Sequence, residues 1–513
     1  MTPRRHLVVV VSAACLLAAG LAASASPGAR SSTTAAPVWS GLTKLQTWAG
    51  GEPSVSFDPS GTGDVYVAAP QSIPAVANTL LGGTNTQGLG VWASRDNGAT
   101  WDAGQNIGSG VGGGDSDVEV ASDHTVYVTD LEAAATAICR STDRGKTYGD
   151  ASLANLGCSE ITTGQTGPDN DRQWLNHAPG GAMYLTYHDF LANVPLIYRS
   201  TDGTTFAPCG NILGSGPGLT NFVPALNGDL VAKPAVNQKN GDVFVGVSEP
   251  DAAQSTKVVG LRFNNLYIAV AKGGCTGTTM FDTHTVYANP TADLAKDFDA
   301  IALDGSGTLY MVAAGKLTGS QSDNGIYVFV SHDAGTTWSA PQRVSPPAQG
   351  AVAMPAIVGG LGNGQVAVGW FGSTTSKDEN DAKDQWRYYV ATSLDAGTTW
   401  ASSTLTQNVI HYGSICTQGT LCGTPADGSD GAGNRNLADF SSLAVNPTTG
   451  CLLAVIPGDP YNRPDLPDGA NSFGSSTYVA RQVGGRCLSI KPPAVSKPAK
   501  KPVRKPTKKA RHR

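Results

Sequence analysis

The chain has few charged residues and, after its first 25 residues, no long apolar run. Only 15% of its 513 residues are charged and 7% are aromatic, which argues against a protein built from solvent-exposed helices. No segment after Ala23 is long enough to cross a membrane, so no transmembrane segment is expected. A Cys-x-x-Cys pair is also missing, which disfavours a zinc site of that kind.

Glycine and proline are abundant, and the N-terminus has the pattern of a secretion signal. The 63 Gly and 31 Pro residues predict many turns. Arg4 and Arg5 precede an apolar run from Leu7 to Ala23, and Ala23-Ser24-Ala25 is typical of a cleavage site. We therefore expect a signal peptide over residues 1–25, a flexible linker over 26–38, and a secreted protein.

Cysteine usage fits an oxidising compartment. Eight of the nine cysteines lie beyond the signal segment, an even number that predicts disulfides. The candidate pairs are Cys139 with Cys158, Cys209 with Cys275, Cys416 with Cys422, and Cys451 with Cys487.

Positive charge is concentrated at the C-terminus. Residues 491–513 contain ten Lys or Arg and no acidic residue, interspersed with proline, and predict a disordered tail. Such a tail is either simply solvated or attracted to an anionic polymer of the cell envelope. The second alternative would hold the protein at the cell surface, where it would act as an interaction scaffold. No specific nucleic-acid partner is expected, and we expect a monomer.

One short pattern occurs five times. It reads Ser-x-Asp-x-Gly-x-Thr-aromatic and suits a tight turn, because Asp accepts hydrogen bonds from backbone N–H groups ahead of it and Gly adopts positive φ. The copies are Ser94 to Trp101, Ser141 to Tyr148, Ser331 to Trp338, Ser393 to Trp400, and a shortened form from Ser200 to Phe206. Repeated turns of this kind indicate repeated sheets.

The segments around these turns predict the fold. Seven segments each hold two apolar-alternating strands joined by a short turn: Pro53 to Ala69, Asp117 to Asp130, Gln173 to His188, Pro234 to Val247, Asp299 to Ala313, Pro355 to Trp370, and Ser441 to Ile456. A third and a fourth strand follow in each unit. Four-stranded units repeated seven times predict an all-β, seven-bladed β-propeller over residues 39–490, with six blades as the alternative. The segment Leu42 to Trp48 is expected to complete the last blade.

The repeated turns resemble those of the sialidase superfamily of Asp-box propellers. The resemblance rests on Asp96, Asp143, Asp202, Asp333 and Asp395, each following a strand of a four-stranded unit. It implies that these residues are structural and that a ligand site lies on the opposite face. A sialidase also needs three arginines around the substrate carboxylate, and the place of the first of them is Gly51 here. The catalytic set of a sialidase is therefore not recognisable.

Carboxylates stand where the predicted inner strands begin. Asp115, Asp171, Asp297 and Asp439 occupy equivalent positions, and they are the candidate catalytic residues. A pair of carboxylates can cleave a glycosidic bond, one donating a proton and the other activating water or attacking. A ring of acids would also repel the carboxylate of a sialic acid unless a cation lay between them.

Basic and titratable residues near the same rim are candidate ligand contacts. They are Arg172, Lys233, His188, Arg435 and Arg463, although pairing with the acids is the simpler role for the basic ones. No cofactor is required, and Ca²⁺ is the alternative use of the clustered acids at 378–381 and 427–434. The expected function is binding of an extracellular glycan or envelope polymer, with glycoside hydrolysis and a surface scaffold as alternatives.

Overall fold

A computed structural model describes most of the chain. The described residues are 35–45, 51–70, 88–107, 114–132, 135–149, 159–160, 170–189, 194–212, 230–250, 262–294, 299–380, 383–416, 434, 436–461 and 475–489. The chain divides into residues 1–33, which lie outside the described residues, and residues 34–513, to which all the described residues belong.

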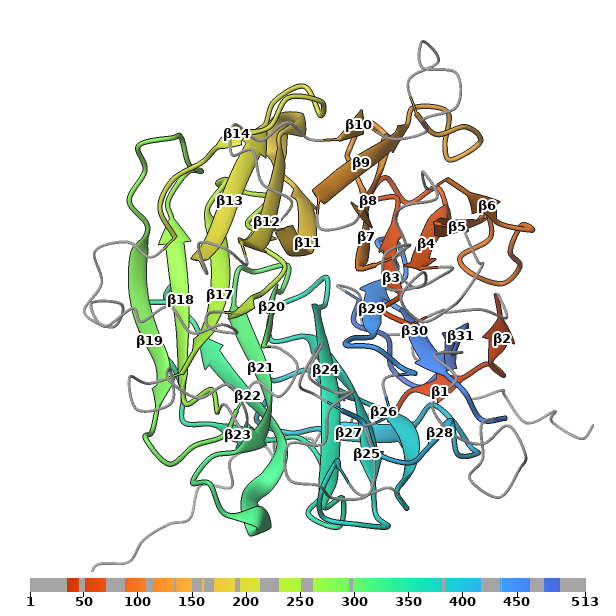
Figure 1. The fold of residues 1–513 in the computed structure, drawn as a ribbon, viewed down its shortest axis with the longest axis vertical. Helices are drawn as coiled ribbons and strands as arrows, with labels where there is room; N and C mark the ends of the chain where they lie inside the picture. Colours follow the sequence, from red (N-terminus) through yellow and green to blue (C-terminus); the bar gives the residue numbers. More distant parts are fainter. Residues whose placement is uncertain are drawn as a thin grey trace, which may run out of the picture. The chain divides into compact units, whose positions relative to one another are not determined.

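Seven antiparallel sheets account for nearly all the described secondary structure (Figure 1). From the innermost strand outward, the first three sheets are β3 (Ser54–Phe57), β4 (Val65–Pro70), β5 (Leu89–Ser94) and β6 (Gln105–Asn106); then β7 (Ser116–Val120), β8 (Val126–Glu132), β9 (Ala135–Ser141) and β10 (Ser159–Glu160); then β11 (Asn170–His177), β12 (Met183–Asp189), β13 (Val194–Ser200) and β14 (Ala207–Pro208). In the fourth sheet β15 (Leu230–Val231) and β16 (Ala235–Val236) precede β17 (Val243–Glu249), β18 (Asn265–Ala271) and β19 (Asp282–Ala288), and the fifth sheet is β20 (Ala300–Leu303), β21 (Leu309–Lys316), β22 (Asn324–Ser331) and β23 (Gln342–Arg343). The sixth sheet is β24 (Ala351–Gly359), β25 (Val366–Ser373), β26 (Gln385–Ser393) and β27 (Ala401–Thr404), with β28 (His411–Tyr412) also on β26, and the seventh is β29 (Ser442–Val445), β30 (Leu452–Gly458) and β31 (Ser476–Gly484), with β1 (Val38–Trp39) and β2 (Thr43–Lys44) on β31.

The innermost strands contact one another in a closed ring. In order around the ring these strands are β3, β7, β11, β16, β20, β24 and β29, and β29 contacts β3 again. The prediction of a seven-bladed β-propeller is therefore confirmed, and the six-bladed alternative is wrong.

The last sheet is completed by the N-terminal part of the described chain. Val38–Trp39 and Thr43–Lys44 pair antiparallel with β31, and Ser40 N donates to the Arg481 carbonyl at 2.9 Å. The outer strand thus begins earlier than the predicted Leu42 to Trp48, and its first residue falls within the predicted linker. The chain after β31 does not add a strand to this sheet. Leu488 instead donates its N–H to the Gly450 carbonyl at 2.7 Å.

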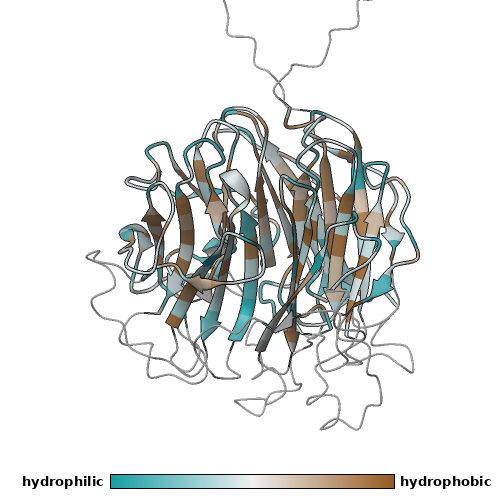
Figure 2. Cartoon of the chain, turned by 90° about the horizontal axis from the view of Figure 1, so that it is seen from above, coloured by the Kyte–Doolittle hydropathy of each residue, from teal (hydrophilic) through white to brown (hydrophobic). Residues whose placement is uncertain are grey.

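Apolar side chains fill the space between neighbouring sheets. The second and third strands of most blades are buried along nearly their whole length, as in β4, β17 and β25. Figure 2 shows the same distribution, with brown segments concentrated along the strands and white or teal in many turns. Burial of both sheet faces explains why these strands read as near-continuous apolar runs.

The five Ser-x-Asp turns join the third and fourth strands of their sheets and share one hydrogen-bond pattern. In the first turn Ser94 Oγ donates to Asp96 Oδ1 at 2.8 Å and accepts from Gly98 N at 2.9 Å, while Thr100 N donates to Asp96 Oδ1 at 2.8 Å. Equivalent bonds to Thr147 lower the pKa of Asp143 to about 2. Asp202, Asp333 and Asp395 accept in the same way. Their carboxylates are therefore occupied in holding turns.

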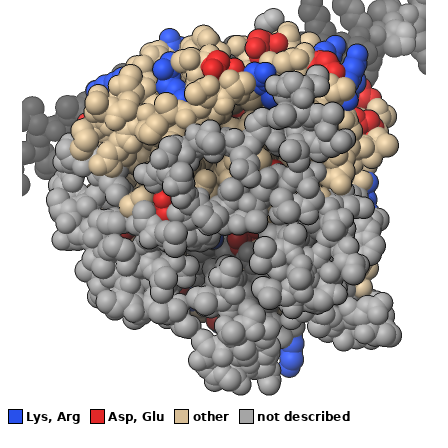
Figure 3. All heavy atoms as spheres, turned by 45° about the horizontal axis from the view of Figure 1, so that its top comes forward, with Lys and Arg blue, Asp and Glu red and all other residues tan. Residues whose placement is uncertain are grey.

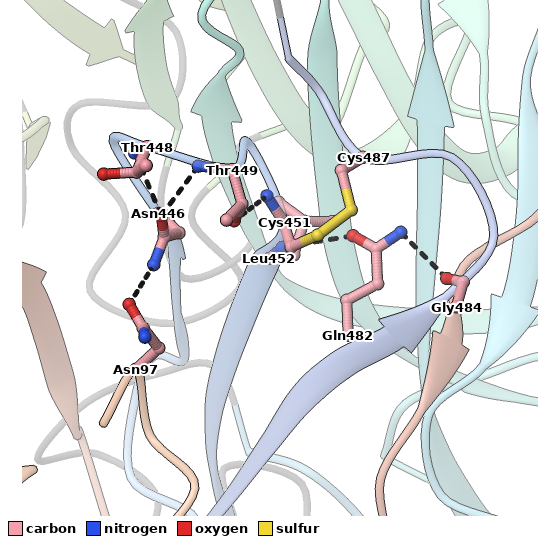
Figure 4. Close-up of a disulfide and its surroundings, with 9 residues drawn as sticks. All are labelled: Asn97, Asn446, Thr448, Thr449, Cys451, Leu452, Gln482, Gly484 and Cys487. Carbon is pink, nitrogen blue, oxygen red and sulfur yellow. Dashed lines mark hydrogen bonds between the residues drawn. A yellow bond between two sulfur atoms is a disulfide. The ribbon is translucent and has the colours of Figure 1, made fainter. Parts of the chain in front are cut away.

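Two of the predicted disulfides are confirmed, Cys209–Cys275 and Cys451–Cys487. The second ties the start of β30 to the segment after β31, beside a network in which Asn446 Nδ2 donates to Asn97 Oδ1 at 2.6 Å (Figure 4). Cys139 and Cys416 are disulfide-bonded as well. The partners predicted for them, Cys158 and Cys422, lie outside the described residues.

A buried histidine links the sixth and seventh blades. His411 and Asp459 are both fully buried, and His411 Nδ1 lies 2.6 Å from Asp459 Oδ1 while Nε2 lies 3.0 Å from the Ser414 carbonyl. Since both ring nitrogens face acceptors, these surroundings favour the imidazolium form of His411. Burial alone would lower the pKa of His411, but Asp459 and Ser414 raise it above its usual 6.5.

This link predicts a pH dependence of stability. Because the pKa of His411 is raised on folding, its stabilising contribution is complete below about pH 6.5 and is lost as the pH rises through the higher folded value. We expect the difference in urea midpoint between wild type and His411→Gln to shrink from pH 5.5 to pH 9. The exposed His332, changed to Gln, serves as the control and should show no such trend. A constant wild-type advantage across this range would contradict the prediction.

Candidate functional site

A cavity of about 440 Å³ runs along the inner strands, and residues from all seven blades line it. Its wall extends from Asp439 and Phe440, at the start of an inner strand, to Leu361 and Pro447, near the ends of inner strands. We call this cavity the channel, and its Asp439 end the mouth. Acidic residues outnumber basic ones on its wall. In Figure 3 red atoms of acidic side chains are visible in gaps between the atoms drawn in grey.

A lysine and two acids form an ion-paired cluster inside the channel. Lys233 Nζ lies 2.9 Å from Asp117 Oδ2 and 3.1 Å from Glu119 Oε2. His177 Nδ1 lies 2.6 Å from the other oxygen of Glu119. Asp117 also accepts from Leu175 N at 2.8 Å. The cluster therefore ties the second, third and fourth blades together across the channel.

The charges of this cluster fix one another. Burial alone would raise the pKa of Glu119, but Lys233 and His177 hold it at about 2. Burial alone would lower the pKa of Lys233, but Asp117 and Glu119 raise it instead. Burial raises the pKa of Asp117 against the opposing effect of Lys233. Lys233 is thus a permanent cation with its own anions, as expected of a paired basic residue.

At the mouth the structure brings together three residues that the sequence had singled out. Arg172 Nε lies 3.2 Å from Asp171 Oδ2, and an Arg172 Nη lies 3.9 Å from Asp439 Oδ2. Arg172 has φ +59°, an unusual conformation for a non-glycine residue, and a bulge separates it from the regular part of β11. Arg172 therefore joins the third and seventh blades across the ring.

Aromatic side chains lie beside this ion-paired group. The Trp174 and Phe440 rings meet edge to face with centroids 4.6 Å apart, and Phe263 also packs against Phe440. Trp174 is only partly buried and lines the channel, yet its indole N–H has no hydrogen-bond acceptor among the described residues. The mouth thus carries an aromatic surface and a buried donor from which no described residue accepts.

One buried carboxyl group stands apart from these ion pairs. Asp299 lines the channel and is 2% exposed, and neither of its oxygens has a hydrogen-bond partner among the described residues. Burial raises the pKa of Asp299 to about 7. The sequence pattern predicted Asp297 as a candidate catalytic residue, and Asp297 lies outside the described residues. Asp299 was predicted only to begin a strand and was not a candidate.

Of the remaining candidates, two are buried near the mouth and two lie outside the described residues. Asp115 is nearly buried at the start of β7, and its carbonyl accepts from Gln173 Nε2. His188 is 1% exposed and pairs in register with Asp171, so it lies at the mouth end of the second strand of its sheet with its side chain buried. Arg435 and Arg463 lie outside the described residues.

Neither a metal-ligand cluster nor a membrane-spanning helix occurs among the described residues. There, no group of three His, Cys, Asp or Glu side chains is arranged to hold a metal ion. Asp378 instead accepts from Asn380 N at 3.1 Å. No helix within the described ranges has the length and apolar character needed to cross a membrane.

Comparison with known proteins finds similar solved structures but no matching family. No family model and no curated protein matches the chain. It is similar to the BP39L lectin from Burkholderia pseudomallei, with 10% identity, a TM-score of 0.48, and 86% of this chain and 98% of that one covered. It is also similar to an α-L-arabinofuranosidase, Arb93A, from Fusarium graminearum (11% identity, TM-score 0.40, 87% and 97% covered) and to the microbial sialidase Hz136 (14% identity, TM-score 0.38). The comparison with the sialidase covers 84% of this chain and 65% of the sialidase. Since the three names denote different activities, the function must be argued from the residues of this chain.

Proposed function

We propose that this protein is an extracellular glycan-binding β-propeller that holds a neutral sugar at the mouth of its channel. The observation that carries the proposal is the grouping of Trp174, Asp171, Arg172 and Asp439 beside a cavity of about 440 Å³. A volume of this order suits a small ligand. The paired disulfides support the extracellular location.

The charge on the channel wall favours a neutral ligand over an anionic one. Asp117, Glu119 and Asp439 face the cavity, and Lys233 is the basic residue on the described wall. Lys233 is already paired with two of these acids. An anionic sugar would therefore meet like charge in a partly desolvated site, which is costly.

The mouth carries the groups with which proteins bind sugars. Carboxylates accept hydrogen bonds from hydroxyl groups, and the Arg172 guanidinium and the Trp174 indole N–H donate them. The Trp174 ring adds an apolar surface for the C–H face of a sugar. This combination supports binding more directly than hydrolysis, because Arg172 bridges Asp171 and Asp439, two of the four carboxylates predicted as candidate catalytic residues.

Replacing Trp174 tests the proposal. We expect Trp174→Ala to weaken binding of a neutral oligosaccharide at least tenfold, about 1.4 kcal/mol, because it removes both the ring and the N–H donor. Isothermal titration calorimetry with oligosaccharides of glucose, galactose, mannose and arabinose measures the effect. Thin-layer chromatography of the same mixtures reports any hydrolysis.

The matched control is Trp338→Ala. Trp338 lies in a Ser-x-Asp turn, where its Nε1 donates to the Gly335 carbonyl at 3.0 Å. We expect this variant to bind like wild type. Equal affinity of wild type and a folded Trp174→Ala variant would contradict the proposed site, and no binding to any of the oligosaccharides would contradict the proposed ligand class.

A further inference from the structure

We infer that Asp299 is a ligand-recognition residue whose carboxyl group donates a hydrogen bond to a hydroxyl or ether oxygen of the glycan in the channel. This inference rests on the proposed function and identifies the group that reads an acceptor oxygen of the bound sugar. Three observations support it: the placement of the side chain, its lack of a partner, and the neutrality of its surroundings.

The fold makes room for this side chain. Asp299 immediately precedes β20, and its carboxyl group lies over Gly246 of β17 in the neighbouring blade. A Cβ atom on residue 246 would come within 2.5 Å of Asp299 Oδ2 and 3.2 Å of the Ala232 Cβ. The absence of a side chain at Gly246 therefore leaves the recess that accepts the carboxyl group.

The ion-paired acids of the channel have partners that Asp299 lacks. Asp117 and Glu119 bind Lys233, and Asp439 lies near Arg172. Both oxygens of Asp299 are unpartnered among the described residues even though the side chain is 2% exposed. A buried polar group without a partner is costly, so such groups mark places where a ligand or a water completes the bonding.

Neutral groups surround the carboxyl group on the described elements packed against it. Gly246 and Ser248 come from β17, Ala232 from the segment after β15, and Ile301 from β20. The charged groups that line the channel, Asp117, Glu119, Lys233, His177 and Asp439, do not contribute to its pKa shift. The Ser248 hydroxyl lies near the carboxyl group but outside hydrogen-bond geometry, and it offsets only part of the effect of burial. With a pKa of about 7, Asp299 carries a proton below neutral pH and can donate it in a hydrogen bond.

The binding test compares Asp299→Asn and Asp299→Ala with wild type from pH 6 to pH 8, using the neutral oligosaccharide that binds wild type most tightly. Deprotonation removes the donor, so we expect wild-type affinity to fall about tenfold between these pH values, as the protonated fraction does for a pKa of about 7. Asp299→Asn keeps a neutral donor and should bind with little pH dependence. Asp299→Ala should bind at least tenfold more weakly than wild type at pH 6.

A second measurement needs no ligand and separates this inference from the proposed function. An acid whose pKa is raised by folding destabilises the protein as the pH rises from about 4 through 7. We therefore expect Asp299→Asn to raise the melting temperature relative to wild type more at pH 8 than at pH 5. The control is Asp102→Asn, since Asp102 is exposed and its Oδ1 accepts from the backbone N–H groups of Ala93 and Gly104, and it should show no such difference.

The outcomes are distinct. If no oligosaccharide binds, the proposed function fails, and the melting experiment alone decides whether Asp299 is a buried neutral acid. If a glycan binds wild type and Asp299→Asn with the same pH dependence, Asp299 does not recognise the ligand, although glycan binding stands. Equal melting shifts at pH 5 and pH 8 would also overturn the inference.

Discussion

Lys233→Met should lower the free energy of unfolding by about 3 kcal/mol, because it leaves Asp117 and Glu119 buried without their cation. Breaking a buried pair typically costs about 3–5 kcal/mol, and the lower end applies since the Lys233 side chain is 34% exposed. Urea unfolding followed by tryptophan fluorescence measures the loss. Methionine keeps most of the apolar stem, so the missing charge dominates the result.

Two further variants show whether charge is the cause. Lys239 is exposed and donates to the Gly305 carbonyl, so Lys239→Met should change stability by less than about 0.5 kcal/mol. The triple variant Lys233→Met, Asp117→Asn, Glu119→Gln removes all three charges and should regain much of the loss. A Lys233→Met protein as stable as wild type would show that water in the channel compensates the two acids.

Removing the Cys451–Cys487 disulfide is the second change for which we expect a large effect. The bond closes a loop with a sequence separation of 36, for which chain entropy predicts a loss of about 3–4 kcal/mol. Arg486, the residue before Cys487, donates its backbone N–H to the Ala35 carbonyl at 3.2 Å. Freeing Cys487 should therefore also weaken the contact between the segment after β31 and the segment that precedes β1. Thermal unfolding of the Cys451→Ala, Cys487→Ala variant measures the effect.

A neighbouring substitution provides the control for this prediction. The Thr449 hydroxyl accepts from Cys451 N at 3.2 Å without taking part in the covalent link, so Thr449→Ala should cost less than about 1 kcal/mol. Equal melting temperatures for wild type and the double alanine variant would contradict a stabilising role. Wild type in reducing agent should approach the unfolding behaviour of the double variant or fall below it, since Cys209–Cys275 is reduced as well.

Local patterns were enough to predict the fold. The Ser-x-Asp turns recur because each has a hydrogen-bond pattern internal to about seven residues, which sequence displays directly. Alternating apolar strands between them gave the repeat, and closure by the N-terminal segment followed from the strand missing in the last unit. These predictions succeeded because each depends on residues that are close together in the chain or on the number of repeated units.

The site was less predictable because its contacts join distant blades. Asp117 and Lys233 are 116 residues apart, and nothing near either residue reveals the other. Arg172, Asp171 and Asp439 were expected at one rim because each stands where an inner strand begins, and the structure adds the ion pairs that join them. Trp174 and Asp299 were missed as candidates. Their side chains stand out only because no described residue forms a hydrogen bond with them, and the sequence does not show this. The recess over Gly246 was a weak available signal, as a lone glycine within an apolar strand often marks a close approach.

The contact between Ala35 and Arg486 makes the propeller a suitable scaffold for circular permutation. A short peptide joining these two positions would turn the closure of the ring into a continuous chain, and new ends could be opened in a Ser-x-Asp turn away from the mouth. Such a rearranged polypeptide would keep every inner strand in place while its terminal fusion point moved to a chosen blade.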